Sequence, residues 1–263
     1  MISAGRFRLA EFAWMQVGDI TTKHVADYLD TLTAVSVAIN ARARLHDIFR
    51  MAETKGMIET GKNPVSATSI PEYVVKRERL SLEQFLAIRA KVVPWAVNAM
   101  NLALMTGQRR EDIAAMKFAD YRNGYLFIVQ GKTGHKLQQQ GSIRLEAVGM
   151  SIDDAVKQCR DRVISKFLCH HVRTSGVYKA GNAVSTDGIT KVFADARDEL
   201  GIVASGPDKS PPTFHEIRSL AERLYKKEYG QEFAQSIMGH KHAKLTAEYD
   251  DLRGGGWAVV EVK

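Results

Sequence analysis

The sequence has few cysteines, no long hydrophobic run and no apolar leader. Only two of its 263 residues are cysteines, and Cys159 and Cys169 can form neither a disulfide framework nor the paired spacing of a structural zinc site. No apolar run approaches the roughly 18 to 20 residues of a membrane span, and the N-terminal MISAGRFRLAEFAWMQ lacks a signal-peptide stretch. These absences favour a reducing compartment, and we expect a cytoplasmic protein with no membrane partner.

The composition is that of a folded chain with a basic surplus. Hydrophobic residues make up 45% and charged residues 25% of the sequence, as in ordinary globular proteins. The 37 basic and 30 acidic residues give a net charge of +7, which favours a polyanionic partner without naming one. An RNA-binding strand pattern with aromatic residues is absent, so a plain RNA-binding protein is disfavoured.

The N-terminal part predicts helices followed by a linker. Apolar residues recur at helical spacing over residues 22–32 and 37–55. The outward face of the second helix carries Arg42, Arg44 and Arg50. A solvated face and a DNA-binding face explain these arginines equally well, because periodicity cannot separate them. Residues 60–79 contain two prolines and little periodicity, which is typical of a linker.

After the linker, the sequence predicts helices and then a hairpin. Ser81 can cap a short helix, and an apolar helix over 95–105 ends at Gly107. Residues 125–130 (YLFIVQ) favour a strand, and the turn 131–134 after it would carry Lys132. We expect the returning strand over 141–145.

The C-terminal third predicts a helix with two polar residues one turn apart. Thr213 can cap this helix, with Glu216 completing a capping box. His215 and Arg218 then share a face and can point at one ligand. Further helices are expected over 151–163, 185–200 and 231–238, and a terminal strand over 257–263. The fold class is therefore α+β, mainly α.

Several of these side chains suit chemistry on a phosphodiester. Two guanidiniums can clamp the nonbridging oxygens, and a tyrosine hydroxyl can attack the phosphorus in line. A lysine or histidine can protonate the departing 5′ oxygen. Each residue alone is more often structural, so single residues decide nothing.

The joint pattern is far more specific than its parts. The segments TGQRREDI, QGKTG, HEIRSL, MGHK and AEYDD follow in this order, with Arg218 and His240 separated by 22 residues and His240 and Tyr249 by nine. From about Asp19 to its end, the chain resembles tyrosine recombinases of the lambda phage integrase type. This resemblance implies a site-specific DNA recombinase that integrates or excises phage DNA through a 3′-phosphotyrosyl intermediate.

The resemblance also implies a role for each matched residue. Tyr249 would be the nucleophile, Arg109 and Arg218 the phosphate clamp, and Lys132 the general acid for the leaving 5′ hydroxyl. The reaction would need no metal and no other cofactor, because the arginines replace a cation at the phosphate.

Three further residues would support the reaction. His215 would help to activate the tyrosine, and His240 would hydrogen-bond to the phosphate. Asp112 matches an acidic helper position of the family and would orient groups of the site, although a surface salt bridge explains it nearly as well.

The resemblance predicts three parts and a set of partners. A partial helical core-binding domain would span 1–59, a linker 60–79 and a mixed α/β catalytic domain 80–263. The implied partners are double-stranded DNA attachment sites, further copies of the chain in a tetramer on DNA, and accessory DNA-bending and excision proteins. The terminal strand would pack either on a neighbouring protomer or in its own sheet.

One departure keeps other functions open. Family members begin with an arm-binding domain and an opening core-binding helix, and neither has a counterpart here. A truncated prophage remnant that binds DNA without efficient recombination is one alternative, and relaxation of DNA like that by a type IB topoisomerase is another.

Two local patterns suggest chemistry that the rest of the sequence does not support. The string GKT at 131–133 lacks the earlier glycine of a P-loop, where Leu126 stands instead. Adjacent Cys169, His170 and His171 have no second pair at ligand spacing, which favours a structural role over a metal site.

Overall fold

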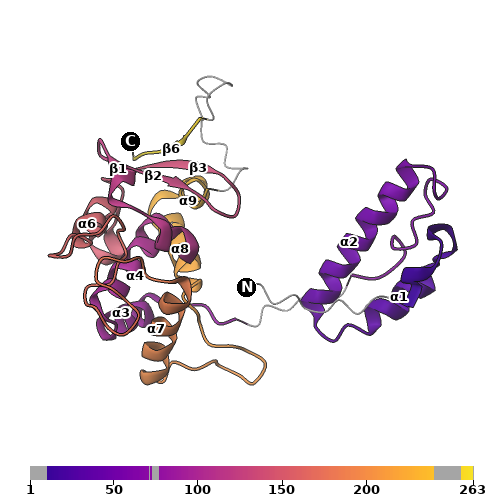
Figure 1. Ribbon diagram of the computed structural model, residues 1–263, viewed down its shortest axis with the longest axis horizontal. Coiled ribbons are helices and arrows are strands. Elements are labelled where there is room, and N and C mark those ends of the chain that lie inside the picture. The colour runs from indigo at the N-terminus through magenta and orange to yellow at the C-terminus, as the bar shows by residue number, and fades with distance from the viewer. Residues whose placement is uncertain (1–10, 71, 73–76, 240–255, 263) are drawn as a thin grey trace. The chain divides into compact units, whose positions relative to one another are not determined.

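The chain folds into two compact units, each with its own hydrophobic core. The computed structural model describes residues 11–70, 72, 77–239 and 256–262. The division falls between Val75 and Lys76 (Figure 1).

The first unit is built on two helices, α1 (Thr22–Asp30) and α2 (Val35–Thr54), preceded by short 3-10 turns at Glu11–Trp14 and Val17–Asp19. The Thr21 hydroxyl caps α1 by accepting a hydrogen bond from the His24 backbone N–H. Val25 of α1 and Phe49 of α2 are buried in the shared core. Both helices expected here are confirmed to within a few residues.

Part of the expected linker belongs to this first unit. Val65 has no exposed surface and lies in the core of the unit. The Arg42 side chain donates hydrogen bonds to Thr68 Oγ1 (2.9 Å), Thr68 O (2.9 Å) and Val65 O (3.2 Å). The segment through Thr68 is therefore packed on α2, because its one large apolar side chain and its carbonyls find partners there.

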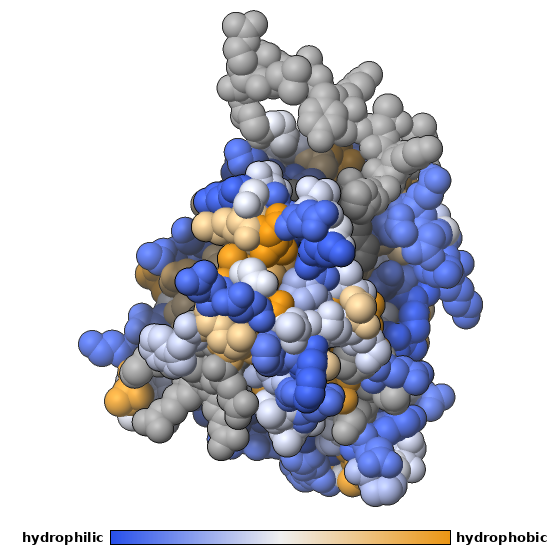
Figure 2. Space-filling view, turned by 90° about the vertical axis from the view of Figure 1, so that its right-hand side faces the viewer, coloured by the Kyte–Doolittle hydropathy of each residue, from blue (hydrophilic) through white to orange (hydrophobic). Residues whose placement is uncertain are grey.

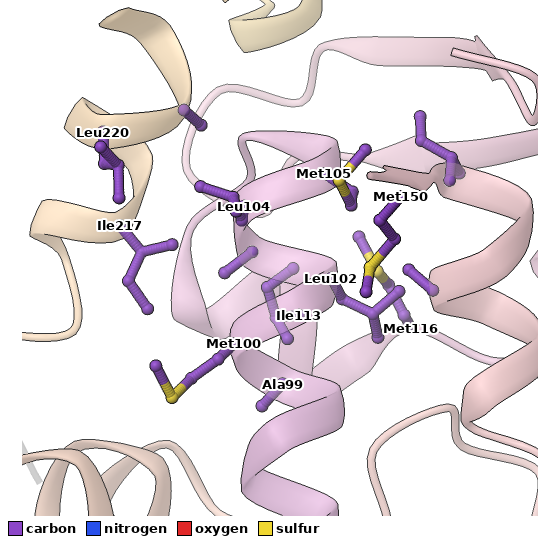
Figure 3. Close-up of a cluster of buried hydrophobic side chains, with 14 of the residues drawn as sticks. Ala99, Met100, Leu102, Leu104, Met105, Ile113, Met116, Met150, Ile217 and Leu220 are labelled. Carbon is purple, nitrogen blue, oxygen red and sulfur yellow. The ribbon is translucent and has the colours of Figure 1, made fainter. Parts of the chain in front are cut away.

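The second unit contains seven helices within its described residues. They are α3 (Leu82–Lys91), α4 (Pro94–Thr106), α5 (Arg110–Ala115), α6 (Ile152–Gln158), α7 (Thr186–Glu199), α8 (Glu216–Tyr229) and α9 (Gln231–Met238). Figure 3 shows side chains of α4, including Leu104 and Met105, in a cluster with Ile113 and Ile217. Helix α4 is apolar on every side, so burial among its neighbours is what stabilises it.

A small mixed sheet completes the second unit. Its strands are β1 (Tyr121–Arg122), β2 (Tyr125–Val129), β3 (Lys136–Gln140) and β6 (Ala258–Val260), in the order β1-β2-β3-β6. The first three are antiparallel, whereas β6 runs parallel to β3 (Figure 1). Strands β4 (Arg144–Leu145) and β5 (Met150–Ser151) form a separate ribbon, and 3-10 turns lie at Phe118–Asp120 and Glu146–Val148. The α+β, mainly α class is confirmed.

The returning strand of the hairpin lies earlier than the sequence indicates. Strand β3 occupies Lys136–Gln140, and the expected range 141–145 holds a turn and the short β4. The sequence KLQQQ has only one apolar residue, so its composition hides a strand. Yet Leu137 and Gln139 are both buried, which means that an amide occupies a position where the alternation would require an apolar residue.

Two helix boundaries also differ from expectation. Helix α8 begins at Glu216, and its N-cap His215 makes no capping hydrogen bond through its side chain. The Glu216 N–H bonds to the Thr213 carbonyl, so Thr213 serves through its backbone in a tight turn that precedes the helix. Helix α6 ends at Gln158, five residues before the expected Val163.

Exposed apolar residues are dispersed over the surface. Figure 2 shows hydrophobic residues scattered between hydrophilic ones on the face turned to the viewer. Among the described residues, no helix combines the length and the apolar character needed to cross a membrane.

Replacing Arg42 with alanine should loosen the segment 63–68 from α2. Three hydrogen bonds from a charged donor are lost, which should cost about 1.5 to 3 kcal/mol locally and speed amide exchange there by about tenfold or more. Hydrogen–deuterium exchange of peptides covering this segment measures the effect. Arg44→Ala is the matched control, since Arg44 is exposed on the same helix. Equal protection in both variants would contradict a structural role for Arg42.

Candidate active site

Arg218 is fixed by two backbone carbonyls at the ends of other helices. Its guanidinium donates to Gly107 O, at the end of α4, and to Met238 O at 2.8 Å, at the end of α9. Gly107 ends α4 with a φ of +65°, a conformation that glycine adopts without strain. Burial, together with the nearby charge of Arg109, lowers the pKa of Arg218 to about 10. The side chain is therefore held rigidly and remains positively charged at neutral pH.

Arg109 lies beside it with part of its guanidinium unpaired. Arg109 is the N-cap residue of α5, two positions after Gly107. Its Nη1 atom is buried, without a hydrogen-bond partner among the described residues. A buried N–H group that lacks a partner costs free energy, and two neighbouring guanidiniums repel each other. An anion bound between them would relieve both penalties.

Asp112 connects the arginines to the hairpin. Its side chain is 6% exposed, and Oδ1 accepts a hydrogen bond of 2.8 Å from the Gly131 backbone N–H. Its Oδ2 is buried without a partner among the described residues, and its negative charge raises the pKa of Arg218. Asp112 therefore lies near enough to Arg218 to stabilise its charge and also holds the start of the turn that carries Lys132.

Lys132 is exposed on the turn between β2 and β3. The turn is closed by hydrogen bonds from Gly134 N to Gln130 O (2.8 Å) and from Gln130 N to His135 O (2.9 Å). Gly134 has a φ of +65°, as a tight turn of this kind requires. The lysine thus extends from a fixed backbone, which agrees with its expected place on a hairpin turn.

His215 lies on the same side of α8 as Arg218, one turn away. Burial of its ring and the charges of Arg77, Arg218 and Arg109 lower the pKa of His215, while Glu216 opposes the shift. The imidazole is therefore mostly neutral at pH 7 and can accept a proton. Beside it lies a cavity of about 350 Å³ lined by Arg77, Arg110, Glu111, Thr190, Thr213, Phe214 and His215.

The structure brings together five of the seven expected residues of the reaction. They are Arg109, Asp112, His215 and Arg218, together with Lys132, whose place beside them rests on the hydrogen bond from the neighbouring Gly131 N–H to Asp112. His240 and Tyr249 lie outside the described residues. Met238, two residues before His240, is described, and its carbonyl accepts the hydrogen bond from Arg218.

The three arginines of α2 differ in their surroundings. Arg44 and Arg50 are exposed, and Arg50 forms a 3.4 Å ion pair with Asp47. The guanidinium of Arg42 is engaged by Val65 and Thr68. Arg44 and Arg50 therefore remain the better candidates for a contact with phosphate.

A group of buried amides beside the site was not expected from the sequence. Gln108, Gln130 and Gln139 are each at most 1% exposed and hydrogen-bond to one another or to backbone carbonyls. Gln108 and Gln130 stand within the segments TGQRREDI and QGKTG, next to Arg109 and the lysine turn, and that position is the signal that could have found them.

The cysteine and histidine cluster has structural surroundings. His170 is buried between the Phe167 carbonyl (2.9 Å) and Asp161 (3.2 Å). Burial raises the pKa of the Cys169 thiol well above its ordinary value. Across the described ranges, no three His, Cys, Asp or Glu side chains are grouped to hold a metal ion.

Comparison with known proteins decides the family. The sequence model of the phage integrase family matches residues 78–254. The chain belongs to the phage integrase family. A prophage integrase, IntE, of Escherichia coli K12 is 39% identical over 259 residues, covering 96% of this chain and 68% of that protein. The integrase of Enterobacteria phage P21 is 38% identical over 251 residues, covering 93% of this chain and 65% of that protein.

Solved structures of a phage integrase share the fold. A lambda integrase dimer bound to a COC′ core site superposes with a TM-score of 0.72 at 32% identity, covering 90% of this chain and 85% of that one. A lambda integrase tetramer bound to a Holliday junction has the same TM-score at 33% identity, covering 90% and 68% of the two chains. The resemblance inferred from the motifs is confirmed. This integrase-family chain spans about two thirds of the length of the curated relatives it matches.

Removing a neighbouring cation should raise the pKa of His215. In the intact protein we expect this pKa below the ordinary value of 6.5, and Arg77→Gln should move it upward because one opposing charge is lost. Titration of the imidazole resonances by NMR measures the shift, with His215→Asn identifying the signal. Because the unfolded chain binds the proton more readily, His215 should also destabilise the fold as pH falls below 6.5. A wild-type pKa at or above 6.5 would contradict the electrostatic assignment.

Proposed function

We propose that the chain is a site-specific DNA recombinase that cleaves and rejoins DNA through a covalent link between Tyr249 and a 3′ phosphate. The first unit would act as a helical core-binding part, with Arg44 and Arg50 facing DNA phosphates, and the second unit would hold the reaction. The protein would work in the cytoplasm of a bacterial host, on the chromosome.

The arginine pair is the observation that carries this proposal. Arg109 and Arg218 place two positive charges side by side, and the buried Nη1 of Arg109 lacks a partner among the described residues. Fork-shaped guanidinium groups fit the nonbridging oxygens of a phosphodiester and stabilise the additional negative charge of its transition state. Membership of the phage integrase family supports the same assignment.

The proposed cleavage step replaces the bond between phosphorus and the 5′ oxygen with a bond between phosphorus and the Tyr249 oxygen. The Tyr249 oxygen attacks the phosphorus and loses its proton to neutral His215, while the bond from phosphorus to the 5′ oxygen breaks. Lys132 gives a proton to that departing oxygen, and His240 hydrogen-bonds to the phosphate. In the reverse step a 5′ hydroxyl attacks the phosphotyrosine, which restores the DNA without ATP.

The partners of this chain are proposed from its relatives. Lambda integrase has been solved as a dimer on a core site and as a tetramer on a Holliday junction. We infer that this chain likewise acts on double-stranded attachment sites as a tetramer, with accessory DNA-bending and excision proteins as further partners. Its DNA contacts would be mostly to phosphate, so binding should weaken steeply with salt.

Tyr249→Phe should abolish cleavage and leave DNA affinity nearly unchanged, because only the nucleophilic oxygen is removed. The assay is relaxation of supercoiled plasmid in EDTA, with an SDS quench to trap the covalent protein–DNA adduct. The assay needs no knowledge of the attachment site.

The outcomes of that assay separate the candidate functions. A wild-type adduct that depends on Tyr249 supports tyrosine chemistry, and exchange of strands between two sites distinguishes a recombinase from a topoisomerase. Equal cleavage by the phenylalanine variant would refute the assignment of Tyr249. DNA binding with no adduct in the folded wild type would instead indicate a remnant that only binds DNA.

Arg218→Ala should also lose cleavage, together with part of the DNA affinity. The substitution removes a phosphate contact, takes the Arg218 donor from the Gly107 carbonyl and takes one of two donors from the Met238 carbonyl, which keeps its hydrogen bond from Gln130. We therefore expect a loss of about 1 to 3 kcal/mol in the free energy of unfolding as well. Adduct formation is measured beside urea unfolding, at a temperature where the variant is folded. Retained cleavage would contradict the clamp.

A further inference from the structure

Gln130 has every hydrogen-bonding group of its side chain in use. The residue is 1% exposed, at the point where β2 enters the turn. Its Nε2 donates to Gln108 Oε1 (2.7 Å) and to Met238 O (2.9 Å), and its Oε1 accepts from Thr133 Oγ1 (2.8 Å). A primary amide has two N–H donors and one oxygen, so this arrangement satisfies all three groups.

Each of these partners is a chain neighbour of a residue of the proposed reaction or is hydrogen-bonded to one. Gln108 precedes Arg109 in the chain, and Thr133 follows Lys132. The Met238 carbonyl accepts a second hydrogen bond, from Arg218 Nη2 at 2.8 Å. One amide therefore bonds to the residue before Arg109, to the residue after Lys132 and to the carbonyl that holds Arg218, which come from three separate parts of the chain.

Close packing fixes this amide in place. A Cβ atom at Gly239, where φ is +71°, would lie 2.7 Å from Gln130 Nε2 and 2.9 Å from Leu137 Cδ1. The end of α9 thus approaches the hairpin more closely than a side chain there would allow. The Gln130 amide is therefore closely packed on the side that faces Gly239.

We propose that Gln130 is a positioning residue that holds the Lys132 turn in register with Arg109 and Arg218. The proposal rests on the proposed function, in which Lys132 protonates the leaving 5′ oxygen. A neutral amide suits this task, because it supplies two donors and an acceptor without adding charge beside the phosphate. A glutamate would instead place a buried carboxylate against the oxygens of Gln108 and Met238.

The test removes the amide and asks whether the lost activity depends on the general acid. Gln130→Met keeps the length of the side chain but makes no strong hydrogen bonds. The site of the wild-type covalent adduct on plasmid is mapped first, and a duplex is made with a sulfur in place of the bridging 5′ oxygen at that position. A thiolate leaves without being protonated, so this duplex does not need Lys132.

We expect Gln130→Met to cleave the ordinary duplex about tenfold or more slowly than wild type, and the sulfur duplex within about twofold of wild type. Gln139→Met is the matched control. Gln139 is an equally buried amide of the same hairpin that bonds to Thr106 O and Ile237 O without touching the turn. For Gln139→Met, the ratio of the cleavage rate on the ordinary duplex to that on the sulfur duplex should equal the wild-type ratio.

A second variant covers the case in which Gln130→Met does not fold. Thr133→Val removes only the hydroxyl that links the exposed turn to the amide, and the same change of ratio is expected to a smaller extent. Equal slowing on both duplexes by the folded variants, or no slowing, would overturn the proposal.

Hydrogen exchange separates this proposal from the proposed function. The amides of residues 131–135 should exchange faster in both variants than in wild type, whether or not the protein cleaves DNA. A wild type without any adduct would refute the proposed function alone, and unchanged exchange in the turn would refute the positioning role alone.

Discussion

Two positively charged guanidiniums lie next to each other in the second unit, and much of that unit serves to keep them there. Arg218 is held by the carbonyls of Gly107 and Met238, which become available because α4 and α9 both end at that point. A glycine in the left-handed region ends each of these helices, since Gly107 and Gly239 have φ values of +65° and +71°. The carbonyls left free at a helix end attract cations, so the ends of two helices offset part of the repulsion between the arginines.

The hairpin is joined to this pair by both charged and neutral groups. Asp112 contributes a carboxylate that lies near Arg218 and accepts the Gly131 N–H, and Gln130 contributes an uncharged amide. One joining group is charged and the other neutral for an electrostatic reason. A second carboxylate, at position 130, would neutralise the arginine pair and weaken its attraction for a phosphate. Amides give directional hydrogen bonds at no cost in net charge, whereas Asp112 limits the mutual repulsion of the cations.

The sequence predicted several helix limits that depend on neighbouring residues, although the cap expected at Thr213 and the end expected for α6 differ from the structure. The Ser81 cap, the end of α4 at Gly107 and the limits of α9 are local features, and all agree with the structure. Strand β3 was missed because the buried Gln139 donates from Nε2 to the carbonyls of Thr106 and Ile237, which are 33 and 98 residues away. The motifs indicated the correct family for a different reason, since a family pattern records which distant residues meet. That pattern contains Gln130 in the segment QGKTG without assigning it a role, which becomes visible only when its three partners are placed in space.

The electrostatics of the site also connect phosphate binding to proton transfer. Arg77, Arg218 and Arg109 lower the pKa of His215, and Arg109 contributes to the lowered pKa of Arg218. In the proposed reaction, a phosphodiester bound between the arginines brings a negative charge that offsets these cations. The pKa of His215 then rises, because the negative phosphate offsets the cations that disfavour the protonated imidazole. The imidazole would therefore become a stronger proton acceptor only once the substrate is in place, at the step where the tyrosine proton must be removed. Burial and these three cations, two of which would bind the phosphate in the proposed reaction, thus keep the base uncharged until it is needed.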